Sequence, residues 1–285
     1  MSSTHPPSTP SSPLPKLILY RMNGACSLVP HILLHELAIP FSAVLMTIGP
    51  NGAHAVDGSL SPEEYIRTVH PNGMIPALQI TSPTSNSSFS SSSSSNDRGE
   101  TTTTTLTENP AIITYIASLT PKGERELLRG GDPLQKAQVL SWLVFLSGSV
   151  HGQGYGALWR PGRYFDLTTT PATSIPPPTT TPIPNFDPTE LKIKQVIQAA
   201  GRRSIDKFYG QIEARIGLGG SVYAVGDGLT VVDFYLYLFW RWGVSVGVPM
   251  RERYGRWEAL VRVLEGRESV RRTLEVEGLE LELEF

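Results

Sequence analysis

The chain has 285 residues, of which 24 are basic and 26 acidic, and its formal net charge is −2. No basic patch dominates, which argues against a nucleic acid as ligand. No apolar run approaches the roughly 20 residues that span a bilayer, so we expect no membrane partner. A single cysteine, Cys26, excludes an intramolecular disulfide and a metal site made of several cysteines, and we expect no metal. With no targeting signal at the start, the composition predicts a cytoplasmic protein.

Three segments are too rich in serine, threonine and proline to bury an apolar core. They are residues 1–15, a predicted disordered tail, and two low-complexity inserts at 81–105 and 167–188. Loop-closure entropy rises slowly with length, so inserts between elements are tolerated. We predict two domains around these inserts, residues 16–122 and residues 131–285.

The first domain opens with a strand, a helix and a second strand. Apolar runs over residues 16–22 and 41–48 predict the two strands. Residues 27–38 carry apolar side chains at helical spacing, with Pro30 in the first turn, where proline is tolerated. This order is typical of a parallel crossover unit.

A turn-rich loop over residues 49–60 follows, and then a short helix that Ser61 caps. Residues 70–80 predict a turn that runs into a strand. Residues 109–119 predict a helix with Asn109 as its cap. Without the insert, the order is strand, helix, strand, helix, a two-stranded hairpin and a last helix.

The second domain is predicted to be all-helical. Its first helix carries a stripe that faces either the core or the cleft between the domains: Ala137, Leu140, Val144, Gly148 and His151. The predicted helices are residues 132–152, 189–218, 230–242 and 256–276.

Six segments, in order and with the right spacing, carry a resemblance to the cytosolic glutathione transferase family. They are residues 24–31 (GACSLVPH), 72–78 (NGMIPAL), 106–112 (LTENPAI), 142–151 (WLVFLSGSVH), 230–233 (TVVD) and 268–278 (ESVRRTLEVEG). The first of these is most similar to the bacterial beta class. The resemblance implies a thioredoxin-like α/β N-terminal domain and an all-α C-terminal domain. It also implies a site between them for glutathione, as a co-substrate rather than a permanently bound cofactor.

Cys26 is predicted at the first turn of a helix, where free N–H groups and partial positive charge favour a thiolate. Such an environment lowers a cysteine pKa from about 8.5 into the range of roughly 3.5–7.5. The other interpretation is a small buried apolar residue. Ser27 could donate a hydrogen bond to the glutathione sulfur, or serve only as a helix N-cap. Tyr20, a third candidate, is one residue off the spacing of the tyrosine classes, and we expect it in the core.

Four residues are candidates for holding glutathione. Ile75-Pro76 is predicted as a cis peptide, which would offer the Ile75 backbone to the cysteinyl part of glutathione. The alternative is an ordinary strand-opening proline. Glu108 and Asn109 lie at a strand-to-helix turn, which suits the carboxylate and the ammonium of the γ-glutamyl end. Many family members have Ser or Gly at the position of Asn109, which can still cap and donate.

His151 matches a histidine that the beta-class pattern places near the glutathione sulfur; alone it would be a core residue. The lysine that tends to follow it in that class is Gly152 here, so a neighbouring cation is missing. His31 and His35 lack the glutamate arrangement of a zinc motif, and we expect them on an exposed or partly exposed face. Four aromatic residues beyond His151 either line an apolar pocket or pack in the core: Tyr155, Trp159, Tyr164 and Phe165.

The resemblance implies an enzyme that conjugates glutathione to an apolar electrophile, as a homodimer, in detoxification or a biosynthetic step. A second hypothesis is a Cys26-dependent thiol transferase or lyase that forms a mixed disulfide with glutathione. A third is a non-catalytic module that keeps the fold for protein binding. The turn at Glu108 argues against the third.

Overall fold

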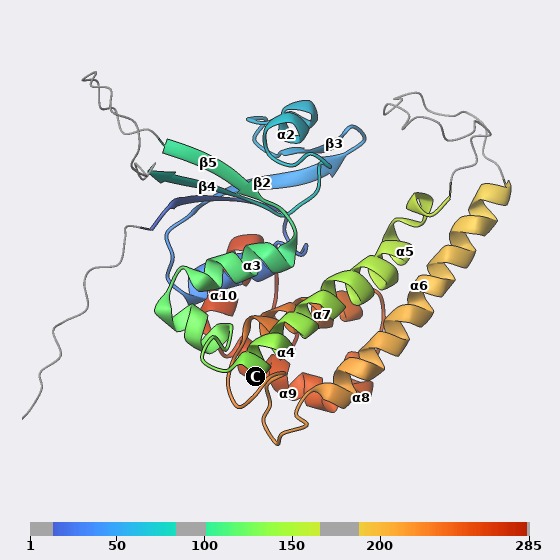
Figure 1. The fold of residues 1–285 in the computed structure, drawn as a ribbon. Coiled ribbons are helices and arrows are strands. Elements are labelled where there is room, and N and C mark those ends of the chain that lie inside the picture. Colours follow the sequence, from blue (N-terminus) through green and yellow to red (C-terminus); the bar gives the residue numbers. More distant parts are fainter. Residues whose placement is uncertain (1–13, 84–100, 166–187, 284–285) are drawn as a thin grey trace, which may run out of the picture.

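The computed structural model describes residues 14–83, 101–165 and 188–283. In these ranges the chain forms a mixed sheet with three helices, followed by a larger helical half (Figure 1). Of the low-complexity segments, residues 1–13, 84–100 and 167–187 lie outside the described residues. The strands are β1 (Lys16–Arg21), β2 (Ser42–Gly49), β3 (Gly52–Ala55), β4 (Ala77–Pro83) and β5 (Thr101–Leu106).

Ten α-helices and three other helical segments occur in the described ranges. The α-helices are α1 (Leu28–Glu36), α2 (Pro62–Thr68), α3 (Asn109–Ser118), α4 (Pro133–Val144), α5 (Gly156–Trp159), α6 (Pro188–Arg215), α7 (Val231–Ser245), α8 (Met250–Arg253), α9 (Gly255–Glu265) and α10 (Glu268–Glu277). The others are the π-helices Gly123–Leu127 and Phe145–Tyr155 and the 3₁₀-helix Pro161–Arg163. The predicted combination of an α/β half with an all-α half is confirmed.

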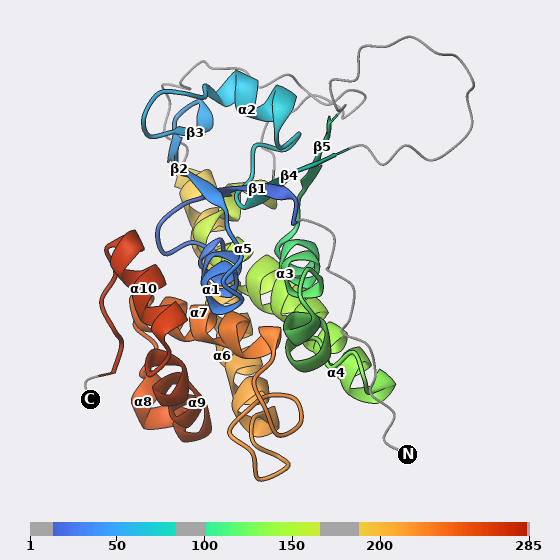
Figure 2. The same cartoon turned by 90° about the vertical axis from the view of Figure 1, so that its left-hand side faces the viewer.

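The sheet has five strands in the order β3-β2-β1-β4-β5, with β1 parallel to β2 and all other neighbours antiparallel. The central strand is apolar on both faces, as a strand covered on both sides must be. Leu17 and Leu19 belong to the large core with α1 and α3, and Tyr20 packs on the opposite face with Tyr65 of α2. Figures 1 and 2 show α1 and α3 between the sheet and the helical half.

Two boundaries of the first half were predicted wrongly. The loop over residues 49–60 contains β3, a short strand that pairs with β2. The insert boundaries 81–105 are also wrong, because β4 continues to Pro83 and a run of threonines from Thr101 forms β5. Threonine is β-branched and favours a strand when a partner is available, even where composition suggests disorder. Thr81 and Thr103 also join their hydroxyls across the pair at 3.0 Å.

The first helix of the second half changes character midway. Asp132 caps α4 by accepting the N–H groups of Leu134 and Gln135, as its sequence predicts. The chain then forms an 11-residue π-helix and continues into α5, well beyond the predicted end at residue 152. A π-helix bonds residue i to i+5, so its side chains leave the stripe of an α-helix.

The prediction that the stripe from Ala137 to His151 faces the core or the cleft is therefore wrong. Leu140 and Val144 are 60% and 61% exposed instead of facing the core or the cleft, while His151 points elsewhere. Residues 256–276 are also two helices, α9 and α10, rather than one.

Helix α7 lies at the centre of the helical half. Its capping box, in which Thr230 and Asp233 bond to each other's backbone, is present as predicted. Twelve of its fifteen residues are buried. It contacts α1 and α3 as well as α4 and α9, so it ties the two halves together. In the described ranges, no helix is long and apolar enough to cross a bilayer.

Candidate active site

A cavity of about 580 Å³ lies between the two halves and contains three of the predicted site residues, Cys26, Ile75 and His151. The N-terminal half contributes the loop after β1, the end of β2, the start of β3 and the turn before Pro76. The helical half contributes the π-helix, the chain after α5 and the last turns of α7. The residues lining it include Met22–Cys26, Asn72–Ile75, His151, Trp159, Arg160, Arg163 and Trp242.

Cys26 is only 7% exposed, and its Sγ lies 3.4 Å from the carbonyl oxygen of Ile75, to which the thiol donates. Burial raises the pKa of the Cys26 thiol to about 11. Arg160 and the backbone N–H groups of Cys26 and Ser27 act in the opposite direction, and Glu108 adds to the increase. The predicted low pKa is therefore wrong, because desolvation outweighs the helix start. At neutral pH Cys26 is a hydrogen-bond donor.

Ser27 and Tyr20 have other partners. Ser27 is fully buried at the N-cap position of α1; its hydroxyl donates to the Met22 carbonyl at 2.9 Å and accepts the Met22 N–H at 3.0 Å. This pair of bonds closes the loop that presents Cys26 and uses the only proton that the hydroxyl can donate. Tyr20 is 7% exposed and packs against Tyr65, the core position expected for it. Neither residue lines the cavity.

The loop before Cys26 is held from the far end of the chain. The N–H of Gly24 donates to Glu277 Oε2 at 2.8 Å, and the Gly24 carbonyl accepts the Trp242 indole N–H at 2.9 Å. Glu277 also pairs with His31 Nδ1 at 2.7 Å and lies 3.8 Å from Arg21. The exposed or partly exposed face predicted for His31 is wrong, since this histidine is 1% exposed.

The predicted cis peptide Ile75-Pro76 is present. The carbonyl of Ile75 accepts from Cys26, and its N–H makes no hydrogen bond within the described residues. Tyr65, buried beneath the turn, donates to the Met74 carbonyl at 2.7 Å and fixes the preceding residue. The Ile75 backbone is thus a short open edge at the cavity wall, next to the thiol.

The turn into α3 differs from the prediction at one residue. Glu108, not Asn109, occupies the N-cap position, at φ 67° and ψ 115°, and its side chain makes no capping bond. Residues hold such a conformation only where the surroundings impose it, and it costs about 1–3 kcal/mol. Asn109 is 5% exposed, and both polar atoms of its amide lack a partner within the described residues. Neither residue lines the cavity, but the Glu108 charge reaches both Cys26 and His70.

His151 lines the cavity with its ring 5.1 Å from that of Trp242. Burial, together with the charges of Arg160 and Arg163, lowers the pKa of His151 to about 4, so the imidazole is neutral at pH 7. The positive charges that act on His151 thus come from two arginines after α5 rather than from position 152. Of the four aromatic candidates, Trp159 lines the cavity, whereas Tyr155 is buried in the core and Tyr164 donates to the Gly152 carbonyl.

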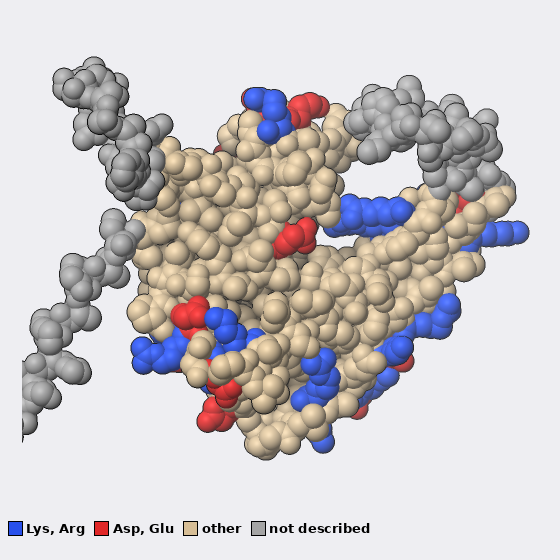
Figure 3. All heavy atoms as spheres, in the orientation of Figure 1, with Lys and Arg blue, Asp and Glu red and all other residues tan. Residues whose placement is uncertain are grey.

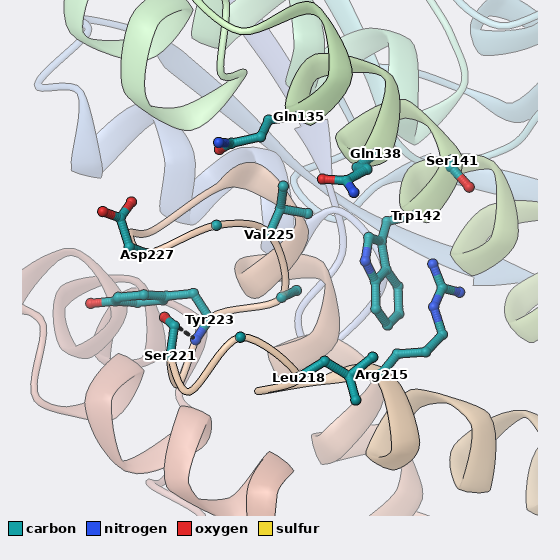
Figure 4. A pocket seen from close by; sticks show the side chains of 13 residues that line it. Gln135, Gln138, Ser141, Trp142, Arg215, Leu218, Ser221, Tyr223, Val225 and Asp227 are labelled. Carbon is teal, nitrogen blue, oxygen red and sulfur yellow. Dashed lines mark hydrogen bonds between the residues drawn. The ribbon is translucent and has the colours of Figure 1, made fainter.

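A second cavity, of about 520 Å³, lies where α4 faces the loop between α6 and α7, and contains no predicted site residue (Figure 4). Its main feature is Arg215, stacked 3.7 Å over the ring of Trp142. Within the described ranges, no group of three His, Cys, Asp or Glu side chains could hold a metal ion.

The sequence did not indicate three residues of this region. Arg160 and Arg163 follow a helix that is longer than the sequence predicts. No sequence pattern therefore indicated that they line the cavity. Glu277 belongs to a recognised segment, but its contact with Gly24 spans 253 positions and has no local signal.

Comparisons with known proteins agree with this geometry. No protein-family model matches the chain. A curated glutathione S-transferase of Escherichia coli is 24% identical over 261 residues, which cover 92% of this chain and 98% of the relative. The solved structure of a sphingomonad glutathione S-transferase complexed with glutathione is 27% identical, with a TM-score of 0.60, over 92% of this chain and 100% of the other. A beta class enzyme from Sphingomonas chungbukensis is 25% identical, with a TM-score of 0.61 and the same coverage.

Proposed function

Because the chain belongs to the cytosolic glutathione transferase family, we propose that it conjugates glutathione to an apolar electrophile in the cavity that Cys26 lines. One observation carries the proposal. The Cys26 thiol, the open backbone edge of Ile75 and the neutral imidazole of His151 face one cavity between the two halves. These groups could hold a cysteinyl backbone and its sulfur while leaving the aromatic side open.

The γ-glutamyl end of glutathione has a separate place in this proposal. The α-carboxylate would accept from the free N–H groups at the start of α3, and the ammonium would pair with Glu108. The unpartnered amide of Asn109 supports this assignment, because a buried polar group without a partner costs about 1–3 kcal/mol until a ligand satisfies it. The unusual backbone conformation of Glu108 also supports this assignment, because it sets the direction of the turn that would bind the γ-glutamyl end.

In the reaction, the glutathione thiol loses its proton to solvent, and the thiolate forms a carbon–sulfur bond with the electrophile. The leaving group departs with the electrons of the bond that breaks. Cys26, a neutral thiol at pH 7, would donate its S–H to the glutathione thiolate in place of the Ile75 carbonyl. His151, also neutral, would orient the sulfur by a hydrogen bond rather than carry a charge.

The mixed-disulfide alternative keeps one observation in its favour, which is that Cys26 lines the cavity. That chemistry needs a thiolate at Cys26. The raised pKa of Cys26 therefore favours conjugation. A non-catalytic module would have no need for the open Ile75 edge.

Three further parts of the proposal concern the whole chain. Residues 16–122 and 131–285 form the two domains. The chain acts as a homodimer, through the exposed stripe Ala137, Leu140, Val144 and Gly148 of the first long helix. It works in the cytoplasm, where glutathione is kept reduced and the free Cys26 stays a thiol.

The test uses the purified full chain with glutathione and chlorodinitrobenzene, in which the aryl chloride is displaced. We expect calorimetric binding of glutathione and enzymatic conjugation. Cys26→Ala should keep binding and lose about tenfold or more in conjugation rate, since a hydrogen bond to a charged group is removed. Arg203→Gln, an exposed change on α6, serves as the control. A wild-type chain that fails to bind glutathione would refute the proposal. Reduction of glutathione mixed disulfides without conjugation would support the thiol transferase instead.

A further inference from the structure

Two arginines face the cavity from the helical half. Arg160 directly follows α5, and Arg163 ends the short 3₁₀-helix after it. Both guanidinium groups point at the same atom of the opposite wall, the sulfur of Met74, at 3.8 Å from Arg160 and 3.3 Å from Arg163. A thioether sulfur is a weak hydrogen-bond acceptor and carries no charge. The two cations are therefore close together without a partner of comparable strength.

Two partly buried arginines elsewhere in the chain are paired with carboxylates. Arg267 forms a two-bond pair with Glu36, and Arg241 bonds to Glu282 at 3.2 Å. Within the described ranges, neither Arg160 nor Arg163 forms an ion pair with a carboxylate. Burial, and after it the charge of Arg163, lower the pKa of Arg160, as expected for neighbouring cations. Figure 3 shows basic side chains at the opening between the two halves, beside the end of α5.

The wall around these cations is aromatic. Trp159 is 44% exposed and stands next to Arg160 in the chain, and its ring lies 4.7 Å from that of Trp242. His151 stacks edge-on against the same Trp242 ring. An aromatic ring of a ligand could therefore rest on these surfaces while a charged substituent reaches the guanidinium groups.

We propose that Arg160 and Arg163 select an electrophile that carries an anionic group, such as an aryl carboxylate, and hold that group at the mouth of the cavity. This inference rests on the proposed function and names the class of its second substrate. Planar guanidinium groups bind carboxylates by paired, charge-assisted hydrogen bonds, which fix orientation as well as position. The reacting carbon would then face the glutathione sulfur, next to Cys26.

Glutathione itself has carboxylates, so the anion must be assigned to one of the two substrates. The γ-glutamyl carboxylate is assigned to the start of α3, in the N-terminal half. The arginines belong to the helical half and adjoin Trp159 and Trp242, which are suited to an aromatic second substrate. The glycyl carboxylate of glutathione is the alternative ligand, and the experiment separates the two.

The experiment compares chlorodinitrobenzoate with its neutral methyl ester, each with glutathione and the full chain. In both, the thiolate forms the carbon–sulfur bond, chloride leaves with the bonding electrons, and the thiol proton goes to solvent. Both substrates are measured with the wild type, with Arg160→Gln, Arg163→Gln and the double variant, and with Arg203→Gln as a matched surface control. Arg160→Lys and Arg163→Lys test whether charge alone restores the effect.

For the double variant we expect kcat/KM with the carboxylate to fall by about tenfold or more, because charge-assisted bonds are lost. With the ester we expect a change below about twofold, and the lysine variants should recover part of the loss. Added salt should weaken the carboxylate reaction alone. Quenching of tryptophan fluorescence by unreactive nitrobenzoate should weaken in the double variant as well.

Three results would overturn the inference. Equal losses with carboxylate and ester would show that the arginines do not recognise the anion. A rise in KM for glutathione alone would assign them to its glycyl end. In both of these cases turnover of the ester leaves the proposed function standing. No turnover of either substrate, with no glutathione binding, would refute the proposed function and this inference together.

Discussion

Cys26 shows how one side chain depends on residues far along the chain. Its place at the start of a helix is evident from the sequence, and that place alone favours a thiolate. Its pKa is nevertheless raised to about 11, because burial outweighs the helix and Arg160. The cavity walls that desolvate it include His151 and Trp242, which no local pattern brings to Cys26. The residue was thus predictable, and its protonation state was not.

Alkylation of Cys26 tests this difference, because the chain has no other cysteine. Only the thiolate reacts, so a raised pKa moves the reaction to higher pH. We expect the rate with iodoacetamide to be very low at pH 7 and to increase about tenfold per pH unit toward pH 11. The chain unfolded in urea is the control and should titrate near about 8.5. A midpoint at or below that of the unfolded chain would contradict the assignment.

At the scale of elements, most helices and strands follow from local patterns, and the exceptions have identifiable causes. The proline after Asn109 and the capping residues Ser61, Asp132 and Thr230 mark helix starts that the structure contains. The threonines of β5 look like part of a disordered insert and become a strand only because β4 lies beside them. The π-helix after Val144 rotates the later side chains away from the face that an α-helix would give them. An α-helical period therefore predicts correctly that Leu140 and Val144 share a face, but wrongly that His151 shares it.

Two deletions test whether β5 contributes to stability while the insert before it does not. Replacing residues 85–99 with a short Gly/Ser link should change the free energy of unfolding by less than about 1 kcal/mol, since closure entropy varies slowly with loop length. Replacing residues 81–104 removes most of the β4–β5 ladder. That deletion should cost more than about 2 kcal/mol, because several hydrogen bonds of about 0.5–1.5 kcal/mol each are lost. Urea unfolding measures both, and equal stability of the two variants would mean that the ladder adds nothing.

For the whole molecule, the two halves were predictable as units, while their contact was not. The apolar composition of α7 predicts a buried helix, and α7 contacts helices of both halves. The site between the halves depends on pairs such as Gly24 with Trp242, which are distant in sequence and have no local signature. The exposed apolar stripe on α4 also concerns the whole molecule. Leu140 and Val144 would remain in contact with water in a monomer, which is unfavourable for apolar side chains.

The stripe predicts where the proposed homodimer would be joined. Placing a charge in an apolar interface opposes association, so Leu140→Glu with Val144→Glu should give a monomer. Light scattering at micromolar concentration should give the mass of two chains for the wild type and of one for this variant. Val276→Glu, an exposed change on α10, should stay dimeric. A wild-type monomer would remove the dimer from the proposal, and a dimeric double variant would move its interface elsewhere.

The bond between Gly24 and Glu277 also has a consequence for the order of events during synthesis. The sheet and its helices leave the ribosome long before the last helix, and they can begin to fold on their own. The loop that presents Cys26 is different, because the carboxylate that holds its Gly24 N–H lies 253 positions further along the chain. A nascent chain therefore carries its thiol on an unfinished loop until α10 has been synthesised. The loop around Cys26 is therefore completed only when α10 docks against it.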